Sequence, residues 1–232
     1  MNAKLLSVVV LLAAVLLIYP GPSRAADVNS PAVKDVNAAS AAAPKNIELP
    51  KPQMEGGKPL MAALKERKTS REFSGEKLPM QVLSNMLWAA NGINRPDGKR
   101  TAPTAMNKQE IDVYVALEQG LFIYNAKANV LIGVLAEDVR AATGKQPFVK
   151  DAPVNLVFVA DYAKMTGYDE EKDFYAATDT GYVSQNVYLF CASEGLATVA
   201  RGYVDKPACA AAMKLRADQK VILAQTVGYP KK

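Results

Sequence analysis

Half of the 232 residues are hydrophobic, which is enough to bury a sizeable core in one domain. The chain contains no histidine, so Ser-His-Asp and Cys-His catalysis, His-ligated zinc and haem with a histidine ligand are excluded. The formal net charge of +5 falls to +3 without Lys4 and Arg24 of the N-terminal leader. This small excess weakly favours anionic ligands and does not indicate nucleic-acid binding.

The N-terminus has the features of a signal peptide. A positive start at Lys4 precedes an apolar stretch over residues 5–19. A Pro-Gly-Pro break follows, and then Ser23 and Ala25 give small residues at the two positions that a signal peptidase reads. We expect residues 1–25 to be cleaved after Ala25 and the protein to be exported, to a bacterial periplasm. The apolar stretch is short for a membrane span, and an uncleaved anchor is the alternative.

The next segment, residues 26–46, is rich in Ala, Asn, Pro, Ser and Val and has no usable periodicity. It is therefore expected to be a flexible linker. The folded domain is expected over residues 47–232. It begins with an extended lead-in from Ile47 to Pro52, where two prolines disfavour helix.

The rest of the chain predicts an α+β domain with long helices against a central sheet. Residues 59–68 are expected to form a helix with Leu60, Ala63 and Leu64 turned inward. The other expected helices are residues 78–91, 174–194 and 205–215. Expected strands are residues 111–117 and 120–125 as a hairpin, 155–160 with both faces covered, 197–201 and 221–227. Residues 130–134 are either a strand or the start of a helix.

The two cysteines, Cys191 and Cys209, have two open interpretations. An exported protein meets an oxidising environment in which they could pair. Cys191 also lies on a helix that is expected to be buried, where a free cysteine behaves as a small core residue. Neither belongs to a CxxC motif, so a redox-active dithiol is not indicated.

Two polar blocks carry the functional signal. The first, RKTSREF, sets Arg67, Lys68, Thr69 and Arg71 within five residues. Guanidinium forks, an ammonium and a hydroxyl are the groups that a phosphate ester needs. Taken alone, these cations could simply be solvated at a helix end. The second block ends in PTAMNKQE, which includes Asn107, and the combination of the two blocks favours a binding site.

Nucleotide motifs of other kinds do not fit. The stretch GINRPDGKR has five residues between its glycines and no Ser or Thr after the lysine, so it fails the P-loop pattern. No GxGxxG follows a strand, so a Rossmann site is not supported.

Together, the two blocks resemble the nitroreductase family of FMN-dependent oxidoreductases, and most closely its thiazole- and oxazole-forming dehydrogenase branch. The resemblance covers residues 47–232 and implies a mixed, mainly antiparallel sheet flanked by helices. It also implies a homodimer with a long interface helix and two FMN sites between the subunits. The apolar stripe Val183, Val187 and Phe190 on the 174–194 helix is the expected interface, and a central core helix of a monomer is the alternative.

The resemblance also implies the roles of individual residues. Arg67, Lys68, Thr69 and Arg71 match the segment that holds the flavin phosphate, ribityl chain and pyrimidine edge. Asn107 matches the asparagine that contacts the ring, because a primary amide offers a donor and an acceptor side by side. The other expected cofactor contacts are Arg100, near the pyrimidine edge, and Arg201 and Gly202, in a loop covering the flavin.

Two departures from the family pattern stand out. Glu110 and Ile111 replace a common Pro-Trp pair. The sequence also stops shortly after Gly228-Tyr229-Pro230, where many relatives continue into a basic arm, and Lys231 and Lys232 are the candidates to replace that arm.

The resulting expectation is an exported FMN oxidoreductase that transfers electrons to or from a small molecule or peptide in two half-reactions. NAD(P)H is a cytoplasmic donor that an exported enzyme would rarely meet. The alternative is a periplasmic flavin-binding protein without turnover. No metal site and no nucleic-acid partner are expected.

Overall fold

A computed structural model describes residues 43–231 of the chain. The expected signal peptide and most of the expected linker lie outside these residues, as does Lys232. No helix within the described part is long and apolar enough to cross a membrane.

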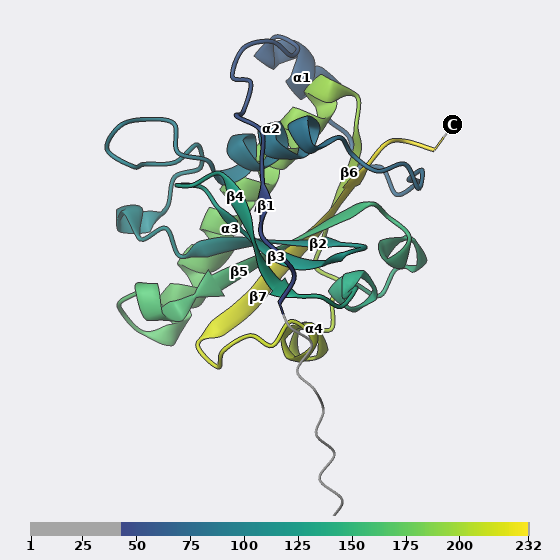
Figure 1. Cartoon of the computed structure of the whole chain (residues 1–232). Helices are drawn as coiled ribbons and strands as arrows, with labels where there is room; N and C mark the ends of the chain where they lie inside the picture. The colour runs from purple at the N-terminus through teal and green to yellow at the C-terminus, as the bar shows by residue number, and fades with distance from the viewer. Residues whose placement is uncertain (1–42, 232) are drawn as a thin grey trace, which may run out of the picture. The chain divides into compact units, whose positions relative to one another are not determined.

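The domain is built on one seven-stranded sheet (Figure 1). Its strand order is β1-β4-β3-β2-β5-β7-β6, and every ladder between neighbouring strands is antiparallel. The expectation of a mixed sheet was therefore wrong. The strands are β1 (Ile47–Glu48), β2 (Ile111–Leu117), β3 (Gly120–Asn125), β4 (Val130–Leu135), β5 (Val154–Asp161), β6 (Ala197–Arg201) and β7 (Gln219–Gly228).

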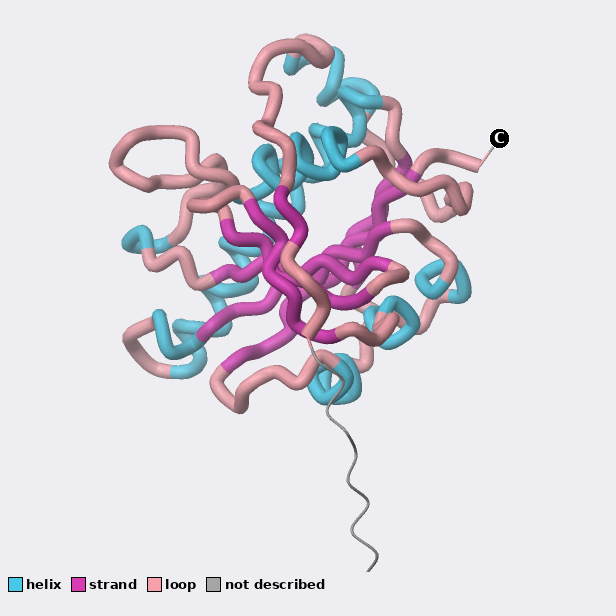
Figure 2. Tube along the Cα trace, in the orientation of Figure 1, coloured by secondary structure: helices cyan, strands magenta, loops and turns pink. Residues whose placement is uncertain are grey.

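Four α-helices accompany the sheet (Figure 2). They are α1 (Leu60–Glu66), α2 (Met80–Asn91), α3 (Asp169–Glu194) and α4 (Lys206–Ala212). Short 3-10 turns lie at η1 (Ala105–Asn107), η2 (Arg140–Thr143), η3 (Pro147–Lys150) and η4 (Tyr162–Lys164). Helix α3 begins five residues before the expected start and ends at Gly195, which takes the left-handed conformation at φ 71°.

The local predictions that depended on strong patterns are confirmed. The β2–β3 hairpin forms with the expected bounds, and all eight residues of β5 are buried. Residues 130–134 form part of a strand, because β4 pairs with β3 on one side and with β1 on the other.

Two hydrophobic clusters lie on opposite faces of the sheet. The larger one packs α2 and α3 against residues such as Phe122, Leu131 and Phe158, and the smaller one packs α4 against Tyr114 and Val157. Alternate residues of a strand point to opposite faces, so each central strand contributes to both clusters.

The cysteines are divided between the two clusters. Both Cys191 and Cys209 are free and fully buried, Cys191 in the larger cluster and Cys209 in the smaller one. The structure therefore favours the interpretation of two core residues over a disulfide.

Two expectations about helix faces were wrong. Of the three α1 residues expected to turn inward, only Ala63 is buried, while Leu60 is 62% and Leu64 is 44% exposed. On α3, Val183 and Val187 are completely buried in the core of their own subunit. That stripe is therefore not available as an intersubunit surface.

Candidate functional site

The RKTSREF block leaves α1 as an extended segment that runs beside the end of the chain. The Ser70 N–H donates to the Thr198 carbonyl at 2.9 Å, and Phe73 forms a β-bridge with Pro230. The Lys231 N–H donates to the Glu72 carbonyl at 3.3 Å. Tertiary folding therefore brings Lys231 next to the basic block, although the two are far apart in sequence.

Residues of this extended segment line a groove of about 420 Å³. Its walls come from the end of α3, the start of β6 and the C-terminal segment, and they include Lys68, Ser70, Tyr188, Thr198 and Lys231. The groove is therefore bordered by hydroxyl groups, by three lysines and by two glutamates, Glu66 and Glu72. Lys58 is paired with Glu66, which leaves Lys68 and Lys231 as the groove cations without an ion pair in the described part of the chain.

Tyr188 of α3 organises the other side of the segment. Its hydroxyl lies 3.0 Å from Thr69 Oγ1 and accepts the Ala200 N–H at 2.9 Å. The Arg67 guanidinium stacks over the Tyr188 ring, with its central carbon 5.2 Å from the ring centroid. One tyrosine thus orients two of the expected site residues and an N–H of the edge strand β6.

The cations of the block have no carboxylate partners. Across residues 43–231 the ion pairs involve other lysines and arginines, and none includes Arg67, Lys68, Arg71 or Lys231. Glu66 and Glu72 lie next to these cations in the chain, and neither forms an ion pair with them. The side chains of Arg67, Lys68 and Arg71 are therefore available to a bound anion.

The second block forms a strained loop at residues 103–109. Met106, Asn107 and Gln109 all adopt positive φ angles, between 50° and 53°, which side chains other than glycine rarely do. Strained backbone of this kind persists only where surrounding contacts hold it, and such strain often lies at functional sites.

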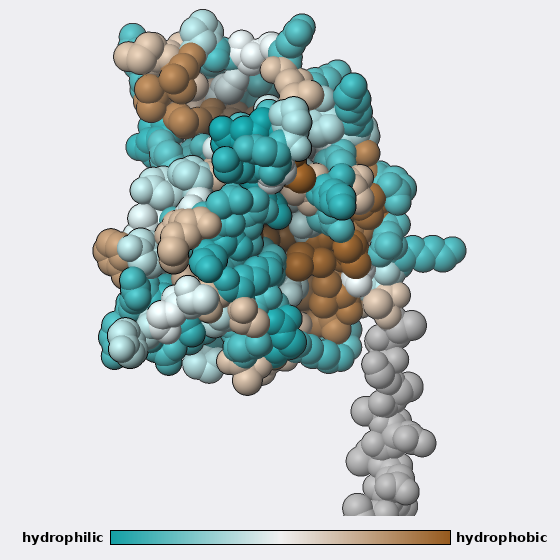
Figure 3. All heavy atoms as spheres, turned by 90° about the vertical axis from the view of Figure 1, so that its left-hand side faces the viewer, coloured by the Kyte–Doolittle hydropathy of each residue, from teal (hydrophilic) through white to brown (hydrophobic). Residues whose placement is uncertain are grey.

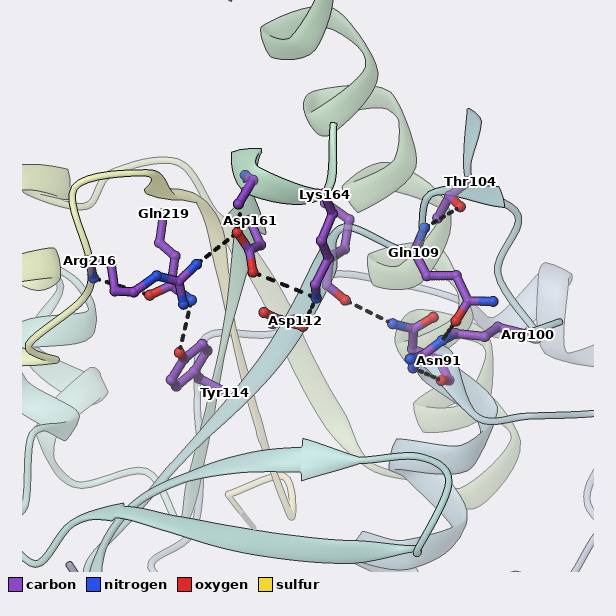
Figure 4. Close-up of polar contacts among 12 residues, drawn as sticks. Asn91, Arg100, Thr104, Gln109, Asp112, Tyr114, Asp161, Lys164, Arg216 and Gln219 are labelled. Atoms are coloured by element: carbon purple, nitrogen blue, oxygen red, sulfur yellow. Dashed lines mark hydrogen bonds and ion pairs between the residues drawn. The ribbon is translucent and has the colours of Figure 1, made fainter. Parts of the chain in front are cut away.

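Gln109 stabilises this loop through its hydrogen bonds. Its Nε2 donates to the Gly98 carbonyl and to Asn107 Oδ1, both at 3.1 Å, and its backbone N–H donates to Thr104 Oγ1 at 2.9 Å. Arg100 completes the arrangement by donating from Nε to Gln109 Oε1 at 2.9 Å (Figure 4). Asn107 is exposed, and the hydrogen bond from Gln109 holds its side chain in place.

The Arg100 guanidinium is directed into the protein. It also donates to the Asn91 carbonyl at 2.9 Å, and its burial lowers the pKa of Arg100 below its ordinary value. In this chain Arg100 therefore connects the loop to the end of α2, which differs from the expected contact with the pyrimidine edge of a flavin.

Arg201 also requires a correction. Its side chain is only 2% exposed and donates to the Thr143 carbonyl at 2.7 Å and to Asn155 Oδ1 at 3.1 Å. A Cβ at Gly144 would lie 1.8 Å from the guanidinium, so the glycine makes room for it. The guanidinium does not reach the groove, whereas the following residue, Gly202, is exposed.

Within one chain the two blocks contact different levels of α3. Thr69 meets Tyr188, whereas the Ala105 N–H donates to Asp179 Oδ2 at 2.9 Å. Nine residues of helix separate these contacts, a rise of about 13 Å at 1.5 Å per residue. In Figure 1 the loop after α2 lies at the left and the C-terminus, beside the basic block, at the right.

Three functional candidates could not be recognised in the sequence. Tyr188 is one of ten tyrosines, and nothing near it marks it as a contact of the basic block. Glu110 and Asp179 are two completely buried carboxyl groups next to the 103–109 loop, and they lie 69 residues apart in the chain. No cluster of three His, Cys, Asp or Glu residues in the described part could hold a metal ion.

The structure is thus an α+β domain with an antiparallel sheet, helices on both faces, a groove lined by Lys68 and Lys231, and a strained loop that carries Asn107. The nitroreductase family model matches residues 64–229, which span both blocks. The chain belongs to the nitroreductase family.

Individual relatives agree with this assignment. A protein of Methanocaldococcus jannaschii named as a nitroreductase is 32% identical over 167 residues, which cover 67% of this chain and 84% of the relative. A crystal structure described as a nitroreductase from Ralstonia eutropha is 41% identical with a TM-score of 0.78, covering 83% of this chain and 94% of that one. A Desulfovibrio desulfuricans structure in complex with FMN is 21% identical with a TM-score of 0.56, covering 76% and 89%, and shares the fold.

Proposed function

We propose that this nitroreductase-family protein is an FMN-dependent oxidoreductase that binds the flavin phosphate at the end of α1. The observation that carries the proposal is the group of cations Arg67, Lys68 and Arg71, which lack carboxylate partners within residues 43–231. A phosphate ester would supply the countercharge, and guanidinium groups bind it through two parallel hydrogen bonds.

The surrounding residues fit such a ligand. Arg67 and Thr69 are already oriented by Tyr188, which reduces the side-chain ordering that binding requires. Lys231 borders the same groove, and Lys232, outside the described residues, is proposed as a further phosphate contact. Gly202 is proposed to approach the flavin through its backbone.

Bound FMN supplies the redox chemistry, taking reducing equivalents from a donor and giving them to an acceptor in two half-reactions. The protein supplies placement and electrostatics. Asn107 Oδ1 already accepts a hydrogen bond from Gln109, so the Nδ2 group remains to donate to an acceptor at the ring edge. Arg67 and Arg71 are the proposed phosphate anchors, and Lys68 is proposed to favour negative charge near the pyrimidine edge. With no histidine in the chain, protons come from water, a tyrosine or the substrate.

A homodimer is part of the proposal. The basic block and the Asn107 loop are separated along α3, and a second copy would allow one flavin to contact both kinds of residue. The buried α3 stripe does not serve this purpose, but α1 exposes Leu60, Met61 and Leu64, with Met61 75% exposed. Apolar surface is visible at the top of Figure 3, the level at which Figure 1 places α1.

The physiological setting is proposed from the sequence. Export after cleavage at Ala25 would separate the protein from cytoplasmic NAD(P)H. A small molecule or peptide dehydrogenated by the flavin, or an electron-carrying partner, is therefore the proposed reactant. The thiazole- and oxazole-forming dehydrogenase branch of the family, which the two blocks resemble, fits such a substrate.

Flavin binding is tested by titrating FMN into purified protein and following the quenching of flavin fluorescence. Arg67→Ala and Arg71→Ala should each weaken binding by about 1.5–3 kcal/mol, or roughly ten- to a hundredfold in Kd. Lys51→Ala, at an exposed lysine of the extended lead-in, is the control and should leave Kd unchanged. Protein that neither copurifies with FMN nor quenches its fluorescence would contradict the proposal.

Turnover and assembly are tested separately. Anaerobic titration with candidate donors should bleach the flavin absorbance, whereas yellow protein that no donor reduces would be the non-catalytic alternative. Light scattering at micromolar concentration should give the mass of a dimer. A monomer that still holds flavin would exclude the two-chain site.

A further inference from the structure

Two buried carboxyl groups, those of Glu110 and Asp179, lie close enough to interact next to the loop that presents Asn107. Glu110, the residue before β2, is 0% exposed, and Asp179 of α3 is 2% exposed. Neither carboxyl oxygen of Glu110 has a hydrogen-bond donor from another residue in the described part of the chain, and the donor that acts on it is its own backbone N–H. The group beside it is another acceptor, so a hydrogen bond between them requires a proton on one of the two.

Asp179 connects this pair to the loop. Its Oδ2 accepts the backbone N–H of Ala105, the first residue of η1, at 2.9 Å. The backbone of Glu110 is fixed from the other side, because its carbonyl accepts the Asp161 N–H at 2.9 Å. Attraction or repulsion between the two carboxyl groups is therefore transmitted through Asp179 to the 103–109 loop. The loop has residues at positive φ, so it depends on contacts such as the one from Ala105 to keep its conformation.

Nearby cations do not neutralise the pair. Lys164 of η4 is the cation whose charge acts on Glu110, and its Nζ is already 2.8 Å from Asp112 Oδ1 and 3.9 Å from Asp161 Oδ2 (Figure 4). Helix α2 contains no charged residue, and Asn91 at its end donates to the carbonyl of Ile111, the residue after Glu110. The balance of charge at the pair is therefore negative when both acids are ionised.

We propose that Glu110 and Asp179 share one proton, and that this proton holds the 103–109 loop on α3 in the conformation that presents Asn107. Glu110 is then a positioning residue: it acts through Asp179 and the Ala105 N–H and does not touch the ligand. The inference rests on the proposed function only for its consequence, namely that loss of the proton releases a flavin-contacting loop.

The electrostatics agree with this geometry. Burial, with an added contribution from the neighbouring Asp179 carboxyl, raises the pKa of Glu110 to about 7. A carboxylate disfavours ionisation of a carboxyl group beside it when no cation compensates the two, which is the direction of the change at Glu110. The shared proton is therefore present in mildly acidic solution and is lost as the pH rises above neutrality.

The direct reporter is hydrogen exchange at the Ala105 amide, expressed as a protection factor so that the intrinsic pH dependence of exchange is removed. In the wild-type protein this protection should fall roughly twentyfold between pH 5.5 and 7.5, and only about fourfold between pH 6.5 and 8.5. The matched control is the Ala208 amide, which donates to Asp205 Oδ1 at the start of α4. Its protection should stay constant over the same range.

Glu110→Gln keeps the shape and supplies an amide donor to Asp179 that does not titrate. Protection of Ala105 in this variant should be independent of pH, and Asp179→Asn should also flatten the profile. A wild-type profile as flat as that of Ala208, or a Glu110→Gln profile that still falls with pH, would overturn the proposal.

Flavin titrations separate this inference from the proposed function. If both hold, the wild-type Kd for FMN rises above pH 7 and the Glu110→Gln Kd does not. Normal FMN binding with flat Ala105 protection refutes the shared proton alone. If the protection of Ala105 falls with pH in a protein that does not bind FMN, the proposed function is refuted and the shared proton is supported.

Discussion

Removal of the Tyr188 hydroxyl should weaken both the sheet edge and the basic block. The strand order places β6 at the end of the sheet, where one side of the strand has no ladder partner. The Tyr188 hydroxyl accepts the Ala200 N–H of that strand at 2.9 Å and bonds to Thr69 Oγ1 at 3.0 Å. Tyr188→Phe removes both contacts and keeps the ring under Arg67.

The magnitude follows from those two hydrogen bonds. A part-buried N–H left without an acceptor costs about 1–2 kcal/mol, and the neutral bond to Thr69 contributes about 1 kcal/mol. The free energy of unfolding should therefore fall by about 2–3 kcal/mol in Tyr188→Phe. Tyr188→Leu should lose a further 0.5–1 kcal/mol or so, because the stacked Arg67 also loses its ring.

Urea unfolding of the FMN-free proteins measures this change as a lower midpoint at constant slope. Tyr168→Phe is the matched control, since Tyr168 is exposed and should tolerate the change within error. The Kd for FMN should rise by about tenfold in Tyr188→Phe, because Arg67 and Thr69 lose their common support. A midpoint equal to that of the control, or an unchanged Kd, would refute the assigned role of Tyr188.

Three further predictions concern the loop and the core. The pKa of Glu110 is raised from 4.5 to about 7 in the folded protein, so its contribution to stability is complete below pH 4.5 and is lost as the pH rises to 7. At about 1.4 kcal/mol per pH unit, the unfolding free energy should fall by roughly 3 kcal/mol over that range, and Glu110→Gln should abolish this slope in urea titrations at several pH values. Cys191 and Cys209 should both react with a thiol reagent only after unfolding; rapid reaction of either one in the native protein, or no free thiols after denaturation, would be inconsistent with two buried free cysteines. Asn107→Ala should alter the flavin spectrum or potential while most of the phosphate-driven affinity remains, and Asn107→Gly, which relieves the positive φ, should isolate the loss of the amide; identical spectra and potential in both variants would remove Asn107 from the site.

The predicted pH dependence comes from Glu110, a residue within the range that matches the family. The match to the family covers residues 64–229, which include strands β2 to β7 and the two polar blocks. Glu110 places an ionisable group in the interior beside Asp179. Properties that depend on this group, such as the pH dependence of the loop, are therefore expected to distinguish this chain from relatives that lack it.

The sequence by itself determined the elements whose signals are local. The hairpin of β2 and β3 followed from two β-branched, aromatic runs separated by Glu118 and Gln119, and the buried strand β5 from an almost continuous apolar run. The end of α3 followed from Gly195, because only a left-handed residue closes the helix there. These features depend on residues a few positions apart, which a sequence displays directly.

Only the tertiary structure decided which side chains meet. Thr69 and Tyr188 are separated by 119 residues, and the Ala105–Asp179 contact spans 74. Arg201 was expected near the flavin by its position in the chain, yet it lies in the interior because β6 directs its side chain towards Thr143 and Asn155. The sequence specifies the alternation of faces along each strand, but which partner covers a face depends on how distant segments pack, and that packing sets the charge, burial and strain of the site.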